Sequence, residues 1–441
     1  MGMRFIYIDN YRGFNDCYIP ILDVNFMVGE NSTGKTSILS LLNIFATTNF
    51  WFNSDFNQED VQLGSFKDII SADSTNRDCF RIGIAEYDNK CNTCNKKDAE
   101  NNFMFLLKFV SKEGLPSISQ YSFLQENIAI TARIREDDKI EFMHEKVNLA
   151  ENTEDELSTL YKKWVKEEFK PEEFKLLKSP FKSRSLLHLS SLIQNEIIAK
   201  GNRFEHDFGL HIPGFASDTA WIAPIRTKPN RTYDQYYKIN FSPEGEHAPY
   251  LIKKLLNQKN IAGSFQEFIK EFGDNSGLFR SIAVSNLGEN PESPFQLDVT
   301  LNKSPINVTC VGYGVSQSLP IIVELFARQK FSWYFIQQPE VHLHPRAQAA
   351  LGDIFYRFAA KEHKRFFIET HSDFAIDRYR LNIRKNPETK HSSQVLFFER
   401  KENENCVSSL IIDQKGAYPD DQPDTFRSFF INEEMSILGL E

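Results

Sequence analysis

The feature that most constrains this chain is a glycine-rich loop at residues 29–37, with the sequence Gly-Glu-Asn-Ser-Thr-Gly-Lys-Thr-Ser. An apolar, alternating run at residues 22–28 precedes the loop and predicts a strand, and residues 37–45 follow it with the spacing of a helix. Glycines allow successive backbone N–H groups to turn toward an anion, and the positive end of the helix dipole adds to the attraction. Strand, loop and helix in this order predict a binding site for a nucleoside triphosphate.

The positions of the loop have predicted roles in holding ATP and Mg²⁺. Lys35 is expected to reach the β- and γ-phosphates, and Thr36 to supply a hydroxyl to Mg²⁺. Backbone N–H groups of the loop would surround the phosphates. The predicted nucleotide-binding residues here are Gly29, Asn31, Ser32, Thr33, Gly34, Lys35, Thr36 and Ser37.

Composition bounds the class of protein. At 441 residues the chain is too long for one simple core, so two or three lobes are expected, and its 39 phenylalanines predict a large aromatic core. No apolar run reaches the roughly 18 residues that a membrane span needs, so no membrane partner is expected. The six scattered cysteines form no disulfide framework, which favours the cytoplasm. The net charge of −9 argues against a surface coated for nucleic acid, but it leaves room for a basic groove on one face.

The pattern of elements predicts three segments. Residues 1–147 are expected to form a nucleotide-binding lobe, with strands at 3–8, 79–87 and 103–110. Residues 148–290 read as a mainly helical insertion, with amphipathic helices in 154–178 and 186–200. Residues 291–441 return to the nucleotide domain after a hairpin at 295–311.

Two short stretches leave alternatives open. Cys91-x-x-Cys94 is either a pair of loop thiols or half of a zinc site completed by distant ligands, since zinc needs four. Residues 221–226, with Pro224 and Arg226, and the following Arg231 form either a surface turn or a loop that contacts phosphate or a partner.

A second glycine-rich stretch opens another predicted helix. Residues 312–320 read Gly-Tyr-Gly-Val-Ser-Gln-Ser-Leu-Pro, and Ser316 stands where an N-cap is expected. Gly314, Ser316 and Gln317 are the predicted phosphate-binding residues of this helix. One nucleotide needs one P-loop, so a second phosphate-binding helix indicates that it covers the nucleotide of another copy. The expected assembly is a head-to-tail dimer or a larger oligomer of such dimers.

Two further strands end in polar residues. Residues 333–336 are followed by Gln-Gln-Pro-Glu at 337–340, and residues 366–369 by Thr-His-Ser-Asp at 370–373. A parallel strand that ends beside a P-loop normally carries an acid for Mg²⁺ and often a second acid that orients water. The predicted catalytic residues are Gln337, Gln338, Glu340 and His371, and the predicted metal ligands are Thr36 and Gln337.

These motifs resemble those of ABC-type P-loop ATPases related to RecF, SMC and OLD (overcoming lysogenization defect) proteins. The resemblance identifies the 29–37 loop as Walker A, 314–317 as the ABC signature and 335–338 as Walker B. It places His344 at the D-loop and makes His371 the switch histidine that touches the γ-phosphate. The implied fold is an α/β ABC-type ATPase domain with a mixed sheet and flanking helices, and the implied activity is ATP hydrolysis.

Two departures from the family pattern bear on activity. Gln337 and Gln338 stand where acids are usual, and a carboxamide binds Mg²⁺ more weakly than a carboxylate and cannot act as a base. Hydrolysis is expected to be slow, whether natural or engineered to trap nucleotide, unless Glu340 or Glu369 compensates. On this basis Gln337→Glu should raise turnover by roughly tenfold or more. The Toprim nuclease of OLD proteins is not expected in the short tail that ends at Glu441.

An ATPase without its own effector resembles the ATPase subunits of phage-defence pairs such as Septu and PARIS. The resemblance implies a nucleotide-gated sensor that controls a separate nuclease or Toprim effector and responds to a phage protein. The alternative is a repair ATPase like RecF or SMC that clamps duplex DNA. Four basic residues are compatible with DNA binding, namely Arg378, Arg380, Arg384 and Lys385.

Overall fold

A computed structural model of the chain describes residues 3–87, 103–125, 127–147, 153–178, 185–199, 218–234, 240–290 and 293–429. Cys91 and Cys94 lie outside these residues. The chain divides into two compact units. The first unit comprises Met1–Ile21, Asn31–Ser217 and Glu399–Val407, and the second comprises Leu22–Glu30, Asp218–Phe398 and Ser408–Glu441.

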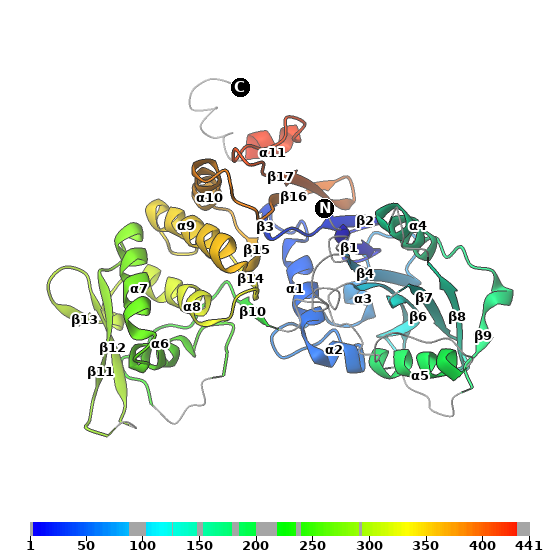
Figure 1. Cartoon of the computed structure of the whole chain (residues 1–441), viewed down its shortest axis with the longest axis horizontal. Coiled ribbons are helices and arrows are strands. Elements are labelled where there is room, and N and C mark those ends of the chain that lie inside the picture. Colours follow the sequence, from blue (N-terminus) through cyan, green and yellow to red (C-terminus); the bar gives the residue numbers. More distant parts are fainter. Residues whose placement is uncertain are drawn as a thin grey trace. The chain divides into compact units, whose positions relative to one another are not determined.

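The first unit is built on an eight-stranded antiparallel sheet in the order β2-β1-β4-β5-β6-β7-β8-β9 (Figure 1). Its strands are β1 (Met3–Asp9), β2 (Cys17–Pro20), β4 (Cys79–Tyr87), β5 (Phe103–Lys112), β6 (Leu115–Gln125), β7 (Ile128–Ile134), β8 (Ile140–Lys146) and β9 (Lys175–Leu176). Its helices are α1 (Lys35–Ala46), α2 (Thr48–Asn53), α3 (Phe66–Ile69), α4 (Thr153–Val165) and α5 (Leu186–Ala199), with a 3₁₀ turn at Pro171–Glu173. The strands predicted at 3–8, 79–87 and 103–110 are confirmed.

The core of the first unit is rich in aromatic rings, as the composition predicts. The rings of Phe80 and Phe109 stack with their centroids 5.0 Å apart, and Trp51 meets Phe105 edge to face at 5.1 Å. On α4, Leu157 and Trp164 are fully buried among residues of the sheet. Helix α4 ends at Val165, earlier than the predicted span of 154–178, and Glu167 nearby adopts a positive φ of 53° that a helix cannot continue.

The second unit is built on a six-stranded sheet in the order β10-β14-β15-β3-β16-β17. Its strands are β10 (Thr219–Ile222), β14 (Trp333–Gln337), β15 (Arg365–Glu369), β3 (Val24–Gly29), β16 (Ser393–Lys401) and β17 (Glu404–Ile411). The strands from β10 to β16 run parallel, and β3 and β14 are buried along their whole length. Parallel sheets are covered by helices on both faces. Because the strands all run in one direction, their carboxyl ends meet at one edge of the sheet.

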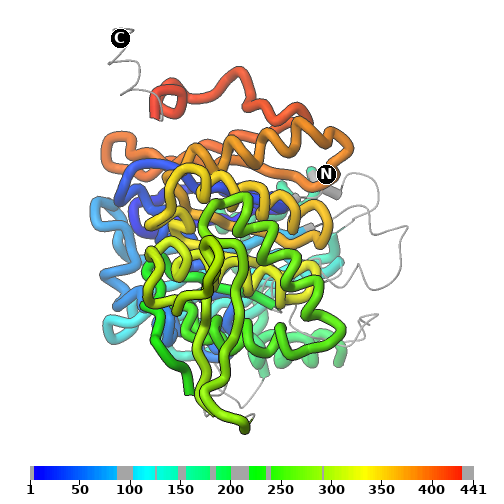
Figure 2. Tube along the Cα trace, turned by 90° about the vertical axis from the view of Figure 1, so that its left-hand side faces the viewer, coloured from blue at the N-terminus to red at the C-terminus, as the bar shows by residue number. Residues whose placement is uncertain are grey.

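Helices and a small sheet complete the second unit. The helices are α6 (Ala248–Asn257), α7 (Ala262–Ser276), α8 (Tyr313–Ala327), α9 (Pro345–Glu362), α10 (Asp373–Lys385) and α11 (Asp424–Phe429). The small sheet is β11 (Ser281–Asn286), β12 (Phe295–Thr300) and β13 (Pro305–Asn307), which confirms the predicted hairpin and adds one strand to it. Figure 2 shows α7, α9 and α10 next to one another, and an Arg357–Glu271 pair and an Arg378–Asp353 pair join them.

The α/β class is confirmed, but the insertion predicted at 148–290 is wrong. Helices α4 and α5 belong to the first unit, whereas β10, α6 and α7 belong to the second. Strand β10 pairs with β14 and is therefore part of the six-stranded sheet. The strand escaped prediction because it has only four residues, a run too short to show a period, and Pro224 follows it closely. Among the described residues, no helix is long and apolar enough to cross a membrane.

Candidate nucleotide-binding site

The glycine-rich loop has the local structure that its sequence predicts. Strand β3 ends at Gly29, and α1 begins at Lys35 with Gly34 as its N-cap. Gly34 has a φ of 95°, and a Cβ atom there would collide with the ring of Phe14. At Gly29, with a φ of 144°, a Cβ atom would collide with the carbonyl oxygen of Phe398. Only glycine fits either position, so the backbone of the loop can present its N–H groups to an anion.

The side chains on either side of Gly34 are buried. Thr33 and Lys35 are 2% and 4% exposed. The first turn of α1 contains no acidic residue that would compete with a phosphate for the helix N-terminus. The predicted binding residues from Asn31 to Ser37 form one continuous turn and helix start. The helix begins two residues earlier than predicted, at Lys35 rather than Ser37, because the N-cap is Gly34.

A second group of predicted residues lies at the carboxyl edge of the six-stranded sheet. Gln337 and Glu369 end β14 and β15 and are opposite each other in register. The Gln337 Nε2 donates to Oε2 of Glu369 over 3.3 Å, and both side chains are buried, with 6% and 5% exposed. Glu369 is also opposite Met27 on β3, the strand that leads to Gly29. The carboxylate of Glu369 therefore comes from the strand between β14 and the P-loop strand.

Gln338 contributes through its backbone. Its N–H donates to the carbonyl oxygen of Glu369 over 2.8 Å, and its φ of 42° turns the chain away from β14. The carbonyl oxygens of Gln337 and Gln338 both accept hydrogen bonds from Nη2 of Arg226, over 3.0 and 3.3 Å. The backbone of the Gln-Gln turn is thus fixed from both of its neighbouring strands.

Arg226 is the buried cation of this edge. It follows β10, and only 3% of it is exposed. Burial lowers the pKa of Arg226 to about 10, against the opposing effect of the Glu340 carboxylate, so the side chain stays charged at neutral pH. Its Nε and Nη1 have no hydrogen-bond partner among the described residues. The sequence left the loop with Arg226 as either a surface turn or a loop that contacts phosphate or a partner. The structure buries the Arg226 side chain, which supports the turn after β14. Arg231 is exposed.

Glu340 joins the turn after β14 to the turn after β15. Its Oε2 accepts from Oγ1 of Thr370 over 2.8 Å, and its Oε1 accepts from the backbone N–H of His371 over 2.7 Å. Burial raises the pKa of Glu340 despite these hydrogen bonds. Both carboxylate oxygens are engaged, so the arrangement makes Glu340 an anchor for the predicted switch residue. The side chain of His371 itself is exposed.

The predicted signature residues lie in the first turns of α8, but Ser316 is not the N-cap of the helix. The N-cap of α8 is Gly312, and Ser316 lies one turn inside the helix, where its Oγ donates to the carbonyl oxygen of Tyr313 over 2.9 Å. The prediction of Ser316 as N-cap is wrong because the N-cap lies four residues earlier, at Gly312. Gln317 is 3% exposed, and its Nε2 donates to the carbonyl oxygen of Arg226 over 3.3 Å. Gly314 permits close packing, since a Cβ atom would lie 3.1 Å from the His342 carbonyl oxygen.

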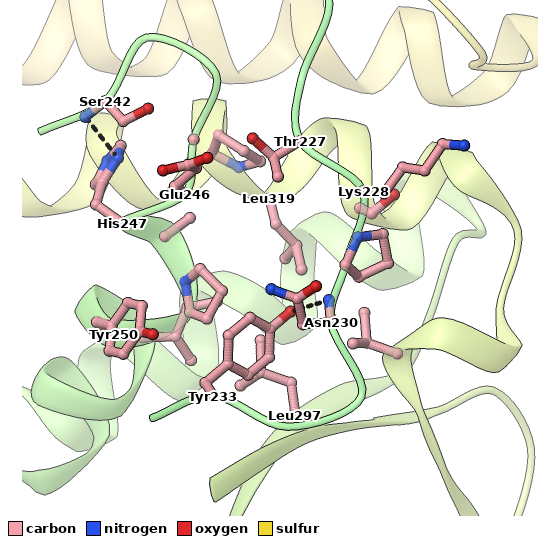
Figure 3. Close-up of a pocket in the computed structure, with 18 of the residues that line it drawn as sticks. Thr227, Lys228, Asn230, Tyr233, Ser242, Glu246, His247, Tyr250, Leu297 and Leu319 are labelled. Carbon is pink, nitrogen blue, oxygen red and sulfur yellow. Dashed lines mark hydrogen bonds between the residues drawn. The ribbon is translucent and has the colours of Figure 1, made fainter. Parts of the chain in front are cut away.

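A cavity of about 430 Å³ lies on the other side of this helix start. Figure 3 shows Tyr233, Tyr250, Leu297 and Leu319 around it, with Lys228 and Asn230 from the loop that follows Arg226. Asn230 N–H donates to the Tyr233 hydroxyl over 3.0 Å. Ser316 lines the cavity as well, but the other predicted site residues do not. The cavity is therefore separate from the carboxyl edge of the sheet.

The donor set at these positions suits a magnesium ion bound together with a nucleotide. Among the described residues, no three His, Cys, Asp or Glu side chains gather into a site that could hold a metal alone. Mg²⁺ usually keeps several waters and is held by phosphate oxygens with one or two protein ligands. Thr36, at the start of α1, carries a hydroxyl of the kind that such a site uses.

Comparison with known proteins identifies the family. The sequence matches the family described as AAA ATPase domain, AAA_15, over residues 1–376, and the chain belongs to this family. It is thus a P-loop ATPase by family. No curated protein matches it significantly in sequence.

Three solved SMC head domains are similar to the chain. A head bound to the C-winged helix domain of ScpA has 12% identity and a TM-score of 0.41, covering 93% of this chain and 98% of that one. The head from Thermotoga maritima has 10% identity and a TM-score of 0.37, covering 93% and 99%. A head with an extended coiled coil derived from Pyrococcus furiosus, bound to the C-terminal domain of ScpA, has 12% identity and a TM-score of 0.39, covering 100% and 99%. Similarities this weak carry no argument about function.

Proposed function

We propose that the chain is an ATP-binding and slowly hydrolysing ABC-type ATPase that acts as a nucleotide-gated switch. The observation that carries the proposal is the glycine-rich loop, in which Gly34 caps α1 and Lys35 opens it. Backbone N–H groups at a helix N-terminus together with a lysine are a phosphate site. Mg²⁺ would be held by Thr36 and the phosphates, where it would offset the charge of the triphosphate.

The test of this proposal is nucleotide binding. The purified chain should bind ATP in the presence of Mg²⁺, as measured by isothermal titration, and release phosphate slowly in a coupled assay. Failure to bind ATP under these conditions would contradict the proposal.

We further propose that two chains associate head to tail on binding ATP. The start of α8 at Gly312 and Tyr313 is exposed, so its N–H groups are accessible to a phosphate held by a second copy. The Ser316 hydroxyl is bonded within its own helix, so backbone N–H groups are the better candidates for this contact. Sedimentation should show a dimer with ATP and Mg²⁺ and a monomer without nucleotide. A chain that stays monomeric in both conditions would contradict the dimer.

The role of the switch is proposed to be antiviral defence, in which the ATPase controls a separate nuclease or Toprim effector and a phage protein acts as trigger. This part rests on the resemblance of the motifs. The alternative, a clamp on duplex DNA, is weakened by two of the four basic residues. Arg378 pairs with Asp353, and Arg380 pairs with Asp377 and lies over the ring of Tyr418. Recovery of a nuclease that co-purifies with the chain would support defence, whereas salt-dependent duplex binding by the chain alone would support the clamp.

A further inference from the structure

The residue that supplies the carboxylate for ATP hydrolysis is not evident from the sequence. The end of β14 carries the amides Gln337 and Gln338, and an amide cannot accept a proton from water. Glu340 is the next acid along the chain, but both of its oxygens accept hydrogen bonds from Thr370 and His371. A carboxylate used to hold two neighbouring groups is poorly placed to turn toward a substrate.

Glu369 is the carboxylate that directly ends one of the two strands, β14 and β15, whose ends carry the predicted catalytic residues. It ends β15, between β14 and β3 in the sheet, and its register partner on β3 is Met27. The chain passes from Met27 to Gly29, where the glycine-rich loop starts, and Gly29 and Glu30 belong to the same compact unit as Glu369. Among the polar side chains that end β14 and β15, Glu369 therefore lies on the strand nearer to the P-loop strand.

Gln337 orients this carboxylate. Its amide Nε2 donates to Oε2 of Glu369 over 3.3 Å within a buried environment. The backbone of Gln337 is itself held by Arg226, so the donor has a fixed position. An amide is suited to this task because it donates a hydrogen bond to a carboxylate without adding a second negative charge beside it.

We infer that Glu369 is the catalytic carboxylate of ATP hydrolysis in this chain and that Gln337 is its positioning residue. The inference rests on the proposed ATPase function. Water attacks the γ-phosphorus while Glu369 accepts its proton, the bond between the γ-phosphorus and the β,γ-bridging oxygen breaks, and ADP leaves with the electron pair. The proton then passes to the phosphate product or to solvent.

This assignment reverses the expected result for Gln337→Glu. From the sequence alone, restoring an acid at 337 should raise turnover. In the structure the new carboxylate would lie beside Glu369, and each of two adjacent carboxylates disfavours ionisation of the other. Turnover of Gln337→Glu should fall at neutral pH, and its pH profile should shift upward relative to the wild-type chain.

The direct test is Glu369→Gln, with the exposed Glu388→Gln as matched control. Glu369→Gln should lower turnover on the order of 100-fold or more, as expected for the loss of a general base. Its affinity for ATP should not change, and the variant recovered after incubation should carry ATP rather than ADP. Glu388→Gln should match the wild-type chain in all three measurements. Glu369→Asp keeps the charge but withdraws it by one methylene, and it should give intermediate turnover. This variant replaces Glu369→Gln as the test if Glu369→Gln does not fold.

The outcomes separate this inference from the proposed function. A wild-type chain that binds no ATP would overturn the ATPase proposal itself. Wild-type binding without turnover would overturn both the proposed hydrolysis and this inference, whereas equal turnover in Glu369→Gln and wild type would overturn only the inference about Glu369. A loss of ATP affinity in Glu369→Gln would also overturn it, because the carboxylate would then serve binding. For Gln337, faster turnover of Gln337→Glu with an unshifted pH profile would show that it does not position Glu369.

Discussion

Both units bury aromatic rings, but the parallel sheet of the second unit also gathers buried charged and amide side chains at one edge. In the first unit the large buried groups are rings, such as Phe80, Phe109 and Trp164, and a buried polar pair such as Ser122 and Thr131 is satisfied within the sheet, over 3.0 Å. In the second unit, charged and amide side chains, among them Arg226 and Glu369, are buried at the carboxyl ends of the strands.

The difference shows which buried groups serve stability and which serve function. Ring packing lowers the free energy of the folded chain without presenting chemistry, and its loss leaves a cavity. Buried polar groups are costly unless they are paired, so their concentration at one edge of a sheet indicates a functional site. Parallel strands make such an edge because their carboxyl ends all point one way. Changes in the first sheet should therefore lower stability, and changes at the second edge should lower activity.

The largest effect is expected at the phosphate loop itself. Lys35→Ala removes the charged donor expected to bind the β- and γ-phosphates. ATP affinity should fall about 10- to 150-fold because a hydrogen bond to a charged group is worth about 1.5–3 kcal/mol. Isothermal titration measures the change. Lys67→Ala, an exposed lysine of the same unit, is the control and should bind ATP normally. Equal affinities of the two variants would place the phosphates elsewhere.

Removing a ring from the first unit tests the other side of the comparison. Trp164→Ala should lower the free energy of unfolding by about 3–5 kcal/mol because the side chain is fully buried against the sheet. Urea unfolding gives the value, and Trp164→Phe should lose less. At a temperature where Trp164→Ala is folded, its ATP affinity should equal that of the wild-type chain. If Trp164→Ala had normal stability but impaired ATP binding, the first sheet would serve function rather than stability, and the comparison of the two sheets would fail.

Arg226 should show the mixed behaviour of a residue that supports a site. Arg226→Met leaves the carbonyl oxygens of Gln337 and Gln338 without their donor, which should cost about 1–3 kcal/mol of stability. Because those carbonyls fix the turn that carries Gln337, turnover should also fall by about tenfold. Arg226→Lys keeps a charge but not the planar fork and should recover little. Paired urea and turnover measurements, with the exposed Arg231→Met as control, would reveal a purely structural role if only stability changed.

The smallest effect concerns pH. Burial lowers the pKa of His391 from its ordinary 6.5 to about 4, and its Nε2 shares a 2.7 Å hydrogen bond with the Tyr379 hydroxyl. Between these two values the unfolded chain binds a proton that the folded chain does not, so stability falls as pH falls through that window, by about 1–3 kcal/mol for a half-buried group. His391→Gln should flatten this dependence in urea titrations from pH 7 to pH 4. An unchanged slope would mean that other groups cause it.

Local features of the chain were open to prediction from its sequence. The P-loop and its flanking strand and helix follow from glycine positions and apolar spacing, and Gly34 occupies a backbone conformation that its residue type favours. The order of motifs likewise predicted the α/β class and the family of P-loop ATPases. These features depend on residues close together in the chain, where propensity and periodicity act directly.

The neighbours of each strand were decided only by the tertiary structure. Strands β14, β15 and β3 lie side by side although they begin at residues 333, 365 and 24, and β10 joins them from a segment that reads as a loop. That order buries Arg226 beneath the turn after β14 and brings the Gln337 amide to Glu369. Gln337, which stands where the sequence motif normally has an acid, therefore donates a hydrogen bond to the carboxylate of Glu369. Pairing between distant strands is selected by the burial of whole faces, a property of the assembled sheet that no short window of sequence contains.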